Sequence, residues 1–151
     1  MFDVKSARQL FTLNRFAEEI QSVCRFTSAL DYAIDIRVGS PTFGQWDTVL
    51  LDTVDRRAIY LAEGLGHAFV ALTDDTSVSY LVSDTYNPSA EHAINPLDPE
   101  LRLEFPDAAG EPILSPKDVE APGLAQAAEL GLLPTWVAAR AYYLELGKAG
   151  S

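Results

Sequence analysis

Hydrophobic and polar residues alternate along residues 30–38, which predicts a β-strand with one apolar and one polar face. The apolar positions are Leu30, Tyr32, Ile34, Ile36 and Val38. The polar positions on the opposite face are Asp31, Asp35 and Arg37. Gly39-Ser40-Pro41 should end this strand, because proline lacks the N–H that a sheet ladder needs.

Further short hydrophobic runs follow at the spacing of an antiparallel sandwich or barrel. Strands are predicted over residues 46–51, 59–61, 67–72 and 77–83. The polar segment 73–76 is predicted to join the last two strands as a hairpin loop. The fold class expected from the pattern is therefore all-β.

The C-terminal part has a different pattern. Residues 95–99 and 105–116 are rich in loop-forming residues, and residues 124–133 are predicted to be helical. Gly131 and Pro134 should end that helix, and Thr135 should cap a last helix that runs through Tyr143.

Residues 1–28 carry a helical pattern, because Leu10, Leu13, Ala17, Ile20 and Cys24 recur at steps of three and four. Residues 6–9 also resemble a capping box. The pattern predicts a helix up to about Glu19. A strand is expected afterwards, across residues 20–28.

The amino-acid composition argues against two classes of protein, those that bind nucleic acids and those that span a membrane. The chain has 151 residues, 48% of them hydrophobic, and its 11 basic and 22 acidic residues give a net charge of −11. Nucleic-acid binding is disfavoured, because phosphate contacts need clustered Lys and Arg. A single cysteine, no signal sequence and no apolar run long enough to span a bilayer predict a cytoplasmic protein without a membrane segment.

Four motifs resemble one enzyme family. They are DYAIDIRVGSPTFGQW (31–46), GLGHAF (64–69), YLVSDTYNPSAE (80–91) and LSPKDVEAP (114–122). Together they resemble the dTDP-4-dehydrorhamnose 3,5-epimerase family, whose members act on dTDP-4-keto-6-deoxyglucose and have a cupin fold. The resemblance covers roughly residues 29–137.

The resemblance implies a cupin-like jelly-roll β-barrel, N-terminally truncated or altered, with a helical C-terminal tail. Residues 29–151 would form the epimerase-like domain, and residues 1–28 an atypical segment in place of the family's N-terminal strands. It also implies a homodimer that binds a dTDP-4-keto-6-deoxy sugar nucleotide and needs no cofactor or metal. The two histidines, His67 and His92, do not have the spacing of the metal site of other cupins.

The family's epimerisation uses a His–Asp dyad as base and a tyrosine as acid. The tyrosine matches Tyr80 and the aspartate matches Asp118, but residues 1–30, where the base should lie, contain no histidine. If residues 8–11 correspond to the family's Arg-Gly-Leu-His, Phe11 stands in place of the base. The family's substrate-binding lysine falls on Ile20.

Other matches place His67 in the sugar pocket, as a hydrogen-bond donor or a substitute base. Substrate-binding positions matched in the same way are Tyr86, Lys117, Asp35 and Arg37.

Each of these assignments has a structural alternative. Tyr80 could fill the barrel beside Val78. Asp118 could cap a helix or be a solvated loop acid, His67 could close the turn before a strand, and Lys117 could be an exposed loop residue.

Two functions follow from the resemblance. One is a dTDP-4-keto-6-deoxyhexose 3- or 3,5-epimerase of deoxysugar biosynthesis. The other is a catalytically impaired family member that binds a nucleotide sugar or serves as an accessory subunit, since loss of a general base costs orders of magnitude in rate. A third interpretation is the product of a truncated or rearranged gene.

Overall fold

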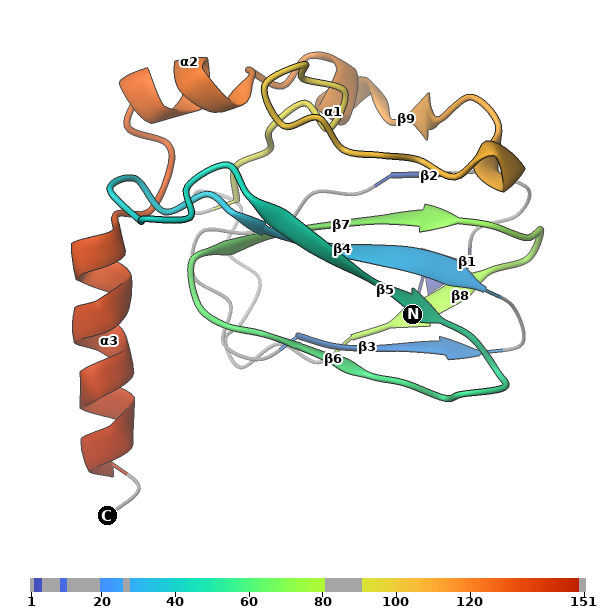
Figure 1. Ribbon diagram of the computed structural model, residues 1–151, viewed down its shortest axis with the longest axis horizontal. Coiled ribbons are helices and arrows are strands. Elements are labelled where there is room, and N and C mark those ends of the chain that lie inside the picture. The colour runs from blue at the N-terminus through green and yellow to red at the C-terminus, as the bar shows by residue number, and fades with distance from the viewer. Residues whose placement is uncertain (1, 4–8, 11–19, 26–27, 81–90, 150–151) are drawn as a thin grey trace.

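Two β-sheets face each other in the computed structural model of the chain, and the C-terminal segment covers one of them from outside (Figure 1). The structure describes residues 2–3, 9–10, 20–25, 28–80 and 91–149, and the described side chains lie between residues 28 and 145. Helix α3 (Trp136–Ala149) extends away from the sheets. No helix in these ranges combines the length and apolarity that crossing a bilayer requires.

The first sheet has the order β5-β4-β7, and all its pairs are antiparallel. Its strands are β4 (Ala29–Asp35), β5 (Trp46–Leu51) and β7 (Leu65–Ala71). The second sheet has the order β1-β8-β3-β6. Its strands are β1 (Phe2–Asp3), β3 (Ile20–Arg25), β6 (Ile59–Leu61) and β8 (Ser77–Ser79). A separate ribbon pairs β2 (Gln9–Leu10) in parallel with β9 (Ile113–Leu114).

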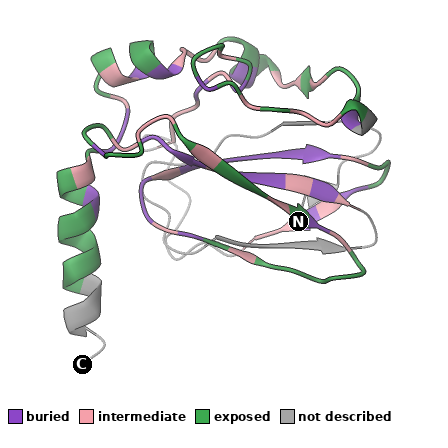
Figure 2. Ribbon diagram, viewed as in Figure 1, coloured by how far each residue is buried: buried purple, intermediate pink, exposed green. Residues whose placement is uncertain are grey.

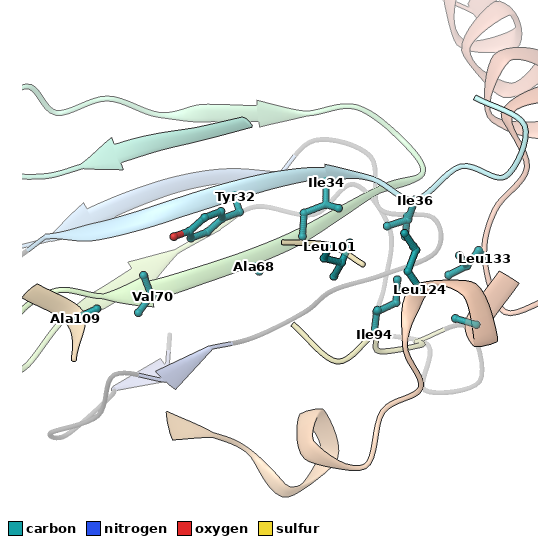
Figure 3. Close-up of a cluster of buried hydrophobic side chains, with 11 residues drawn as sticks. Tyr32, Ile34, Ile36, Ala68, Val70, Ile94, Leu101, Ala109, Leu124 and Leu133 are labelled. Carbon is teal, nitrogen blue, oxygen red and sulfur yellow. The ribbon is translucent and has the colours of Figure 1, made fainter. Parts of the chain in front are cut away.

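The apolar face of β4 packs against the C-terminal segment, as the alternation predicts. Tyr32 and Ile34 of the strand, and Ile36 just after it, join a buried cluster with side chains of the tail, among them Leu101 and Leu124 (Figure 3). The Tyr32 hydroxyl donates a hydrogen bond to the carbonyl of Glu104 at 2.7 Å, and the Trp46 indole donates to that of Leu101 at 3.0 Å. The tail is thus held across the sheet by apolar burial and by satisfied polar groups.

The opposite face of the sheet looks into the space between the two sheets. Ala29, Leu51 and Phe69 of the first sheet form a second buried cluster with Val78 of the other sheet, and Tyr80 packs against it. Figure 2 shows β4 and β7 mostly buried, whereas most of α3 is exposed. The polar positions of β4 therefore lie on the inner face of the sandwich.

Short helices follow the strands. They are the 3₁₀ helix Asp107–Ala109, α1 (Pro116–Val119), α2 (Leu124–Glu129) and α3. The helix predicted over residues 124–133 ends earlier because Gly131 takes a positive φ of 66°. The predicted cap at Thr135 is confirmed, since its hydroxyl accepts the Ala138 N–H at 3.2 Å.

Two predictions of local structure are wrong. Residues 73–76 do not form a hairpin, because β8 pairs with β1 and β3 on its two sides and the loop crosses between sheets. Gln9 and Leu10 form strand β2 instead of a helix, while the strand expected from Ile20 is confirmed as β3. The rest of the predicted helix, like residues 81–83 of the last predicted strand, lies outside the described residues.

Candidate active site

A buried histidine–aspartate pair lies on the inner face of the first sheet. In the β4–β7 register Asp31 stands opposite Phe69 and Ala33 opposite His67, so Asp31 and His67 are diagonal neighbours on one face. Nε2 of His67 lies 2.9 Å from both carboxylate oxygens of Asp31. The side chains are 1% and 0% exposed, so this pair is shielded from water.

The pair leaves one nitrogen of His67 available. A carboxylate only accepts hydrogen bonds, so this contact suits the tautomer in which Nε2 carries the proton and donates it to Asp31. In that tautomer Nδ1 is an acceptor, and it is buried without a hydrogen-bond partner among the described residues. The ring is oriented from two sides, because its centroid also lies 6.0 Å from that of Phe69. The alternative that His67 closes a turn is wrong, since the residue lies within β7.

Tyr80 approaches the same space from the second sheet. It directly follows β8 and packs against the cluster that contains Phe69, the neighbour of His67. Burial, and next the charge of Glu91, raises the pKa of the Tyr80 hydroxyl. The phenol therefore keeps its proton at neutral pH and can serve as a proton donor.

Asp118 lies in the first turn of α1, and it is only 3% exposed. Ser115 is the N-cap: its hydroxyl donates to Oδ2 of Asp118 at 2.6 Å and accepts the Asp118 N–H at 3.2 Å. The alternative of a solvated acid is wrong, and the N-cap itself is Ser115. Strand β9 directly precedes α1 and pairs with β2, and β2 contacts β7, the strand that carries His67.

Lys117 and Tyr86 are less closely defined. The Lys117 side chain is 58% exposed, and its Nζ lies 3.9 Å from Oε2 of Glu91. It borders an open hollow of about 460 Å³. The lining residues are Glu91, His92, Ala93, Lys117, Glu120, Ala121, Pro122 and Leu132. Tyr86 and Phe11 lie outside the described residues.

Asp35 and Arg37 organise the turn after β4. The Asp35 carboxylate accepts hydrogen bonds from the Arg37 guanidinium at 2.8 and 2.9 Å, and from the hydroxyls of Ser40 and Thr42 at 2.6 and 2.5 Å. The Arg37 guanidinium also stacks 4.5 Å from the centre of a Trp136 ring. Both groups therefore have structural partners, and their role in substrate binding stays a prediction.

Replacing Asp35 with asparagine is expected to destabilise the fold by about 3 kcal/mol, because it leaves Arg37 without its buried counter-charge. Burial alone would raise the pKa of Asp35, but its hydrogen bonds with Arg37, Ser40 and Thr42 outweigh this and lower it. A lowered pKa stabilises the folded state above the unfolded pKa, so the difference between wild type and variant should be complete above about pH 4 and shrink at lower pH.

Urea unfolding at several pH values measures this difference. Asp74→Asn, at an exposed loop position, is the matched control and should leave stability unchanged within about 0.5 kcal/mol. An equal loss in both variants would contradict the role given to Asp35.

Sequence reasoning missed Asp31 as the partner of His67. The alternation places Asp31 on the polar face of β4, but only the β4–β7 register brings the two side chains together. It also missed Glu63, a buried carboxyl group in the turn before β7. Within the described ranges, no group of three or more His, Cys, Asp and Glu side chains is arranged to hold a metal ion.

Comparison with known proteins identifies the family. The family model of dTDP-4-dehydrorhamnose 3,5-epimerase matches residues 11–126. A Mycolicibacterium smegmatis protein of that name is 48% identical over 91% of this chain and 69% of its own length. A Streptomyces bikiniensis dTDP-4-dehydro-6-deoxyglucose 3-epimerase is 51% identical over 78% of this chain and 59% of its own length. The chain thus covers 69% and 59% of the length of these two curated relatives.

Solved structures show the same fold. The Mycobacterium tuberculosis RmlC epimerase superposes with a TM-score of 0.86 at 44% identity, covering 94% of this chain and 74% of that one. ChmJ, a 3'-monoepimerase from Streptomyces bikiniensis solved with dTDP-quinovose, gives 0.85 at 43% identity, covering 97% and 73%. The expected cupin-like jelly roll with a helical C-terminal tail is confirmed. The chain belongs to the dTDP-4-dehydrorhamnose 3,5-epimerase family.

Proposed function

We propose that the protein acts on a dTDP-4-keto-6-deoxyhexose and inverts C3, or C3 and C5, by exchange of the proton next to the C4 ketone. The observation that carries the proposal is the buried His67–Asp31 pair. Its Nδ1, unpartnered within the described part of the chain, shares the interior of the sandwich with Tyr80. Relatives named as 3- and 3,5-epimerases support this substrate class.

Epimerisation next to a ketone requires three functional groups from the protein. A base removes the α-proton, a donor stabilises the enolate oxygen that forms at C4, and an acid returns a proton to the opposite face of the carbon. Tyr80 is suited to the last task, because its hydroxyl stays protonated. Nδ1 of His67 can accept the α-proton, and the resulting imidazolium is stabilised by Asp31.

Three further residues complete the proposed site. Asp118 matches the aspartate that orients the catalytic histidine in the family, although Phe11 stands at the matching histidine position here. Lys117 would contact the diphosphate as a point charge. Tyr86 would contact the sugar or the nucleotide. The proposal also includes a cofactor-free homodimer in the cytoplasm, with residues 1–28 as a segment distinct from the domain of residues 29–151.

The test is deuterium exchange. Wild-type protein is incubated with dTDP-4-keto-6-deoxyglucose in deuterated water, and NMR follows deuterium at C3 and C5. Tyr80→Phe is expected to lower this exchange at least about 100-fold, because phenylalanine has no proton to donate. Tyr143→Phe, on the exposed face of α3, is the matched control and should exchange like wild type.

The second candidate is a nucleotide-sugar-binding or accessory subunit. It is favoured by the absence of histidine from residues 1–30, where the resemblance places the family's base. Under this alternative the wild type would bind the nucleotide sugar without exchanging its protons. Exchange that persists unchanged in Tyr80→Phe would contradict the role of Tyr80.

A further inference from the structure

Glu63 is a buried carboxyl group with an oxygen that no described residue satisfies. It lies in the turn between β6 and β7 and is 2% exposed. Its Oε2 and Nδ1 of His67 are the two buried side-chain polar atoms in the described part of the chain that lack a hydrogen bond. A buried polar atom left unsatisfied costs about 1–3 kcal/mol, and more when it is charged, so its presence needs a reason.

The turn itself does not need this carboxylate. The Leu65 N–H donates to the Ala62 carbonyl at 3.2 Å, and Gly64 adopts a φ of 78° that closes the bend. Gly64 also packs against the stem of Arg37, which a Cβ atom would meet at 3.0 Å. Backbone geometry and packing thus hold the turn, and an apolar side chain at position 63 would avoid the cost.

Glu63 lies in the turn that leads directly into β7. His67 and Phe69 of that strand face the space between the two sheets, where the proposed site lies. The two unsatisfied atoms therefore belong to consecutive parts of the chain, one in the turn and one in the strand that follows it.

We propose that Glu63 is a substrate-positioning residue whose carboxylate accepts a hydrogen bond from a hydroxyl group of the bound sugar nucleotide. This inference rests on the proposed function, since it names a further contact of the same site. A hydroxyl fits better than the diphosphate, because a carboxylate repels a second anion. The free protein bears the cost of the unsatisfied oxygen, and ligand binding removes it.

The test compares stability and binding in the same variants. Glu63→Met replaces the carboxylate with an apolar side chain of similar length. We expect the melting temperature of the free protein to rise and the affinity for dTDP-quinovose, measured by calorimetry, to fall about tenfold. Glu63→Gln keeps a carbonyl acceptor, so it should retain part of the affinity. Glu111→Met, at an exposed position, is the control and should change neither quantity.

The outcomes separate this inference from the proposed function. A lower melting temperature in Glu63→Met, or an affinity equal to that of wild type, would overturn the role of Glu63 alone. A wild type that does not bind dTDP-quinovose would overturn both. A wild type that binds but does not exchange protons would overturn the proposed catalysis and leave Glu63 to be decided by the two variants.

Discussion

Replacing Phe11 with histidine is expected to raise the rate of deuterium exchange by about 10²- to 10⁴-fold, the range that a positioned general base contributes. Leu10 of β2 stands opposite Leu114 of β9, and position 11 follows β2 just as Ser115, the N-cap of α1, follows β9. Position 11 itself lies outside the described residues, so the expectation rests on the resemblance, which aligns position 11 with the family's catalytic histidine. The same resemblance matches Asp118, whose side chain is buried, with the family's orienting aspartate.

The gain should depend on Asp118. The double variant Phe11→His/Asp118→Asn should lose most of it, because an imidazole without its carboxylate is not held in the correct tautomer. Phe11→Asn is the matched control, since asparagine is polar but cannot take a proton at neutral pH. An equal gain with asparagine, or a gain that survives Asp118→Asn, would contradict the assignment of position 11 to the missing base.

The fold was predictable where the sequence pattern is local. Strict alternation identified β4 and its two faces, because one face meets the apolar tail and the other meets the second sheet. The ends of strands were less predictable. The run predicted to continue to Val38 ends at Asp35, since that carboxylate is used to bind Arg37 and the turn hydroxyls.

The pairing of distant segments could not be predicted in this way. The helical spacing around Leu10 is a local signal, but β2 pairs with β9, which lies in a distant part of the chain. The loop of residues 73–76 resembles a hairpin for the same reason, because local polarity does not show that β8 has β1 and β3 as neighbours. Tertiary pairing outweighs local propensity in both cases.

The candidate site was predictable only in part. Motif resemblance identified His67, Tyr80 and Asp118, and the first two share the interior of the sandwich. Asp31 became visible as a site residue only through its register with β7. Glu63 gave no signal in the sequence, because an isolated acid before a glycine usually lies in an exposed turn.

Replacing His67 with asparagine is expected to lower deuterium exchange at least about 100-fold, the second large effect. Asparagine keeps a polar side chain on the inner face, but it can neither accept the α-proton nor donate from a charged ring. Asp31→Asn should cause a smaller loss, because the imidazole remains while its Nε2 proton and its orientation are no longer fixed by a carboxylate. Because both side chains are buried, their hydrogen bond should contribute more to exchange than the same contact would at the protein surface.

Both variants are measured in the wild-type chain, in which His67 is the proposed base. Thermal unfolding and dTDP-quinovose binding show whether each variant still folds and binds, and Asp74→Asn again serves as the exposed control. Because the pair is buried, some loss of stability is expected as well. A His67→Asn protein that folds, binds the nucleotide sugar and exchanges protons like wild type would show that the pair serves the fold alone. Tyr80 would then be left as the proton donor without a known base, and the accessory-subunit alternative would gain weight.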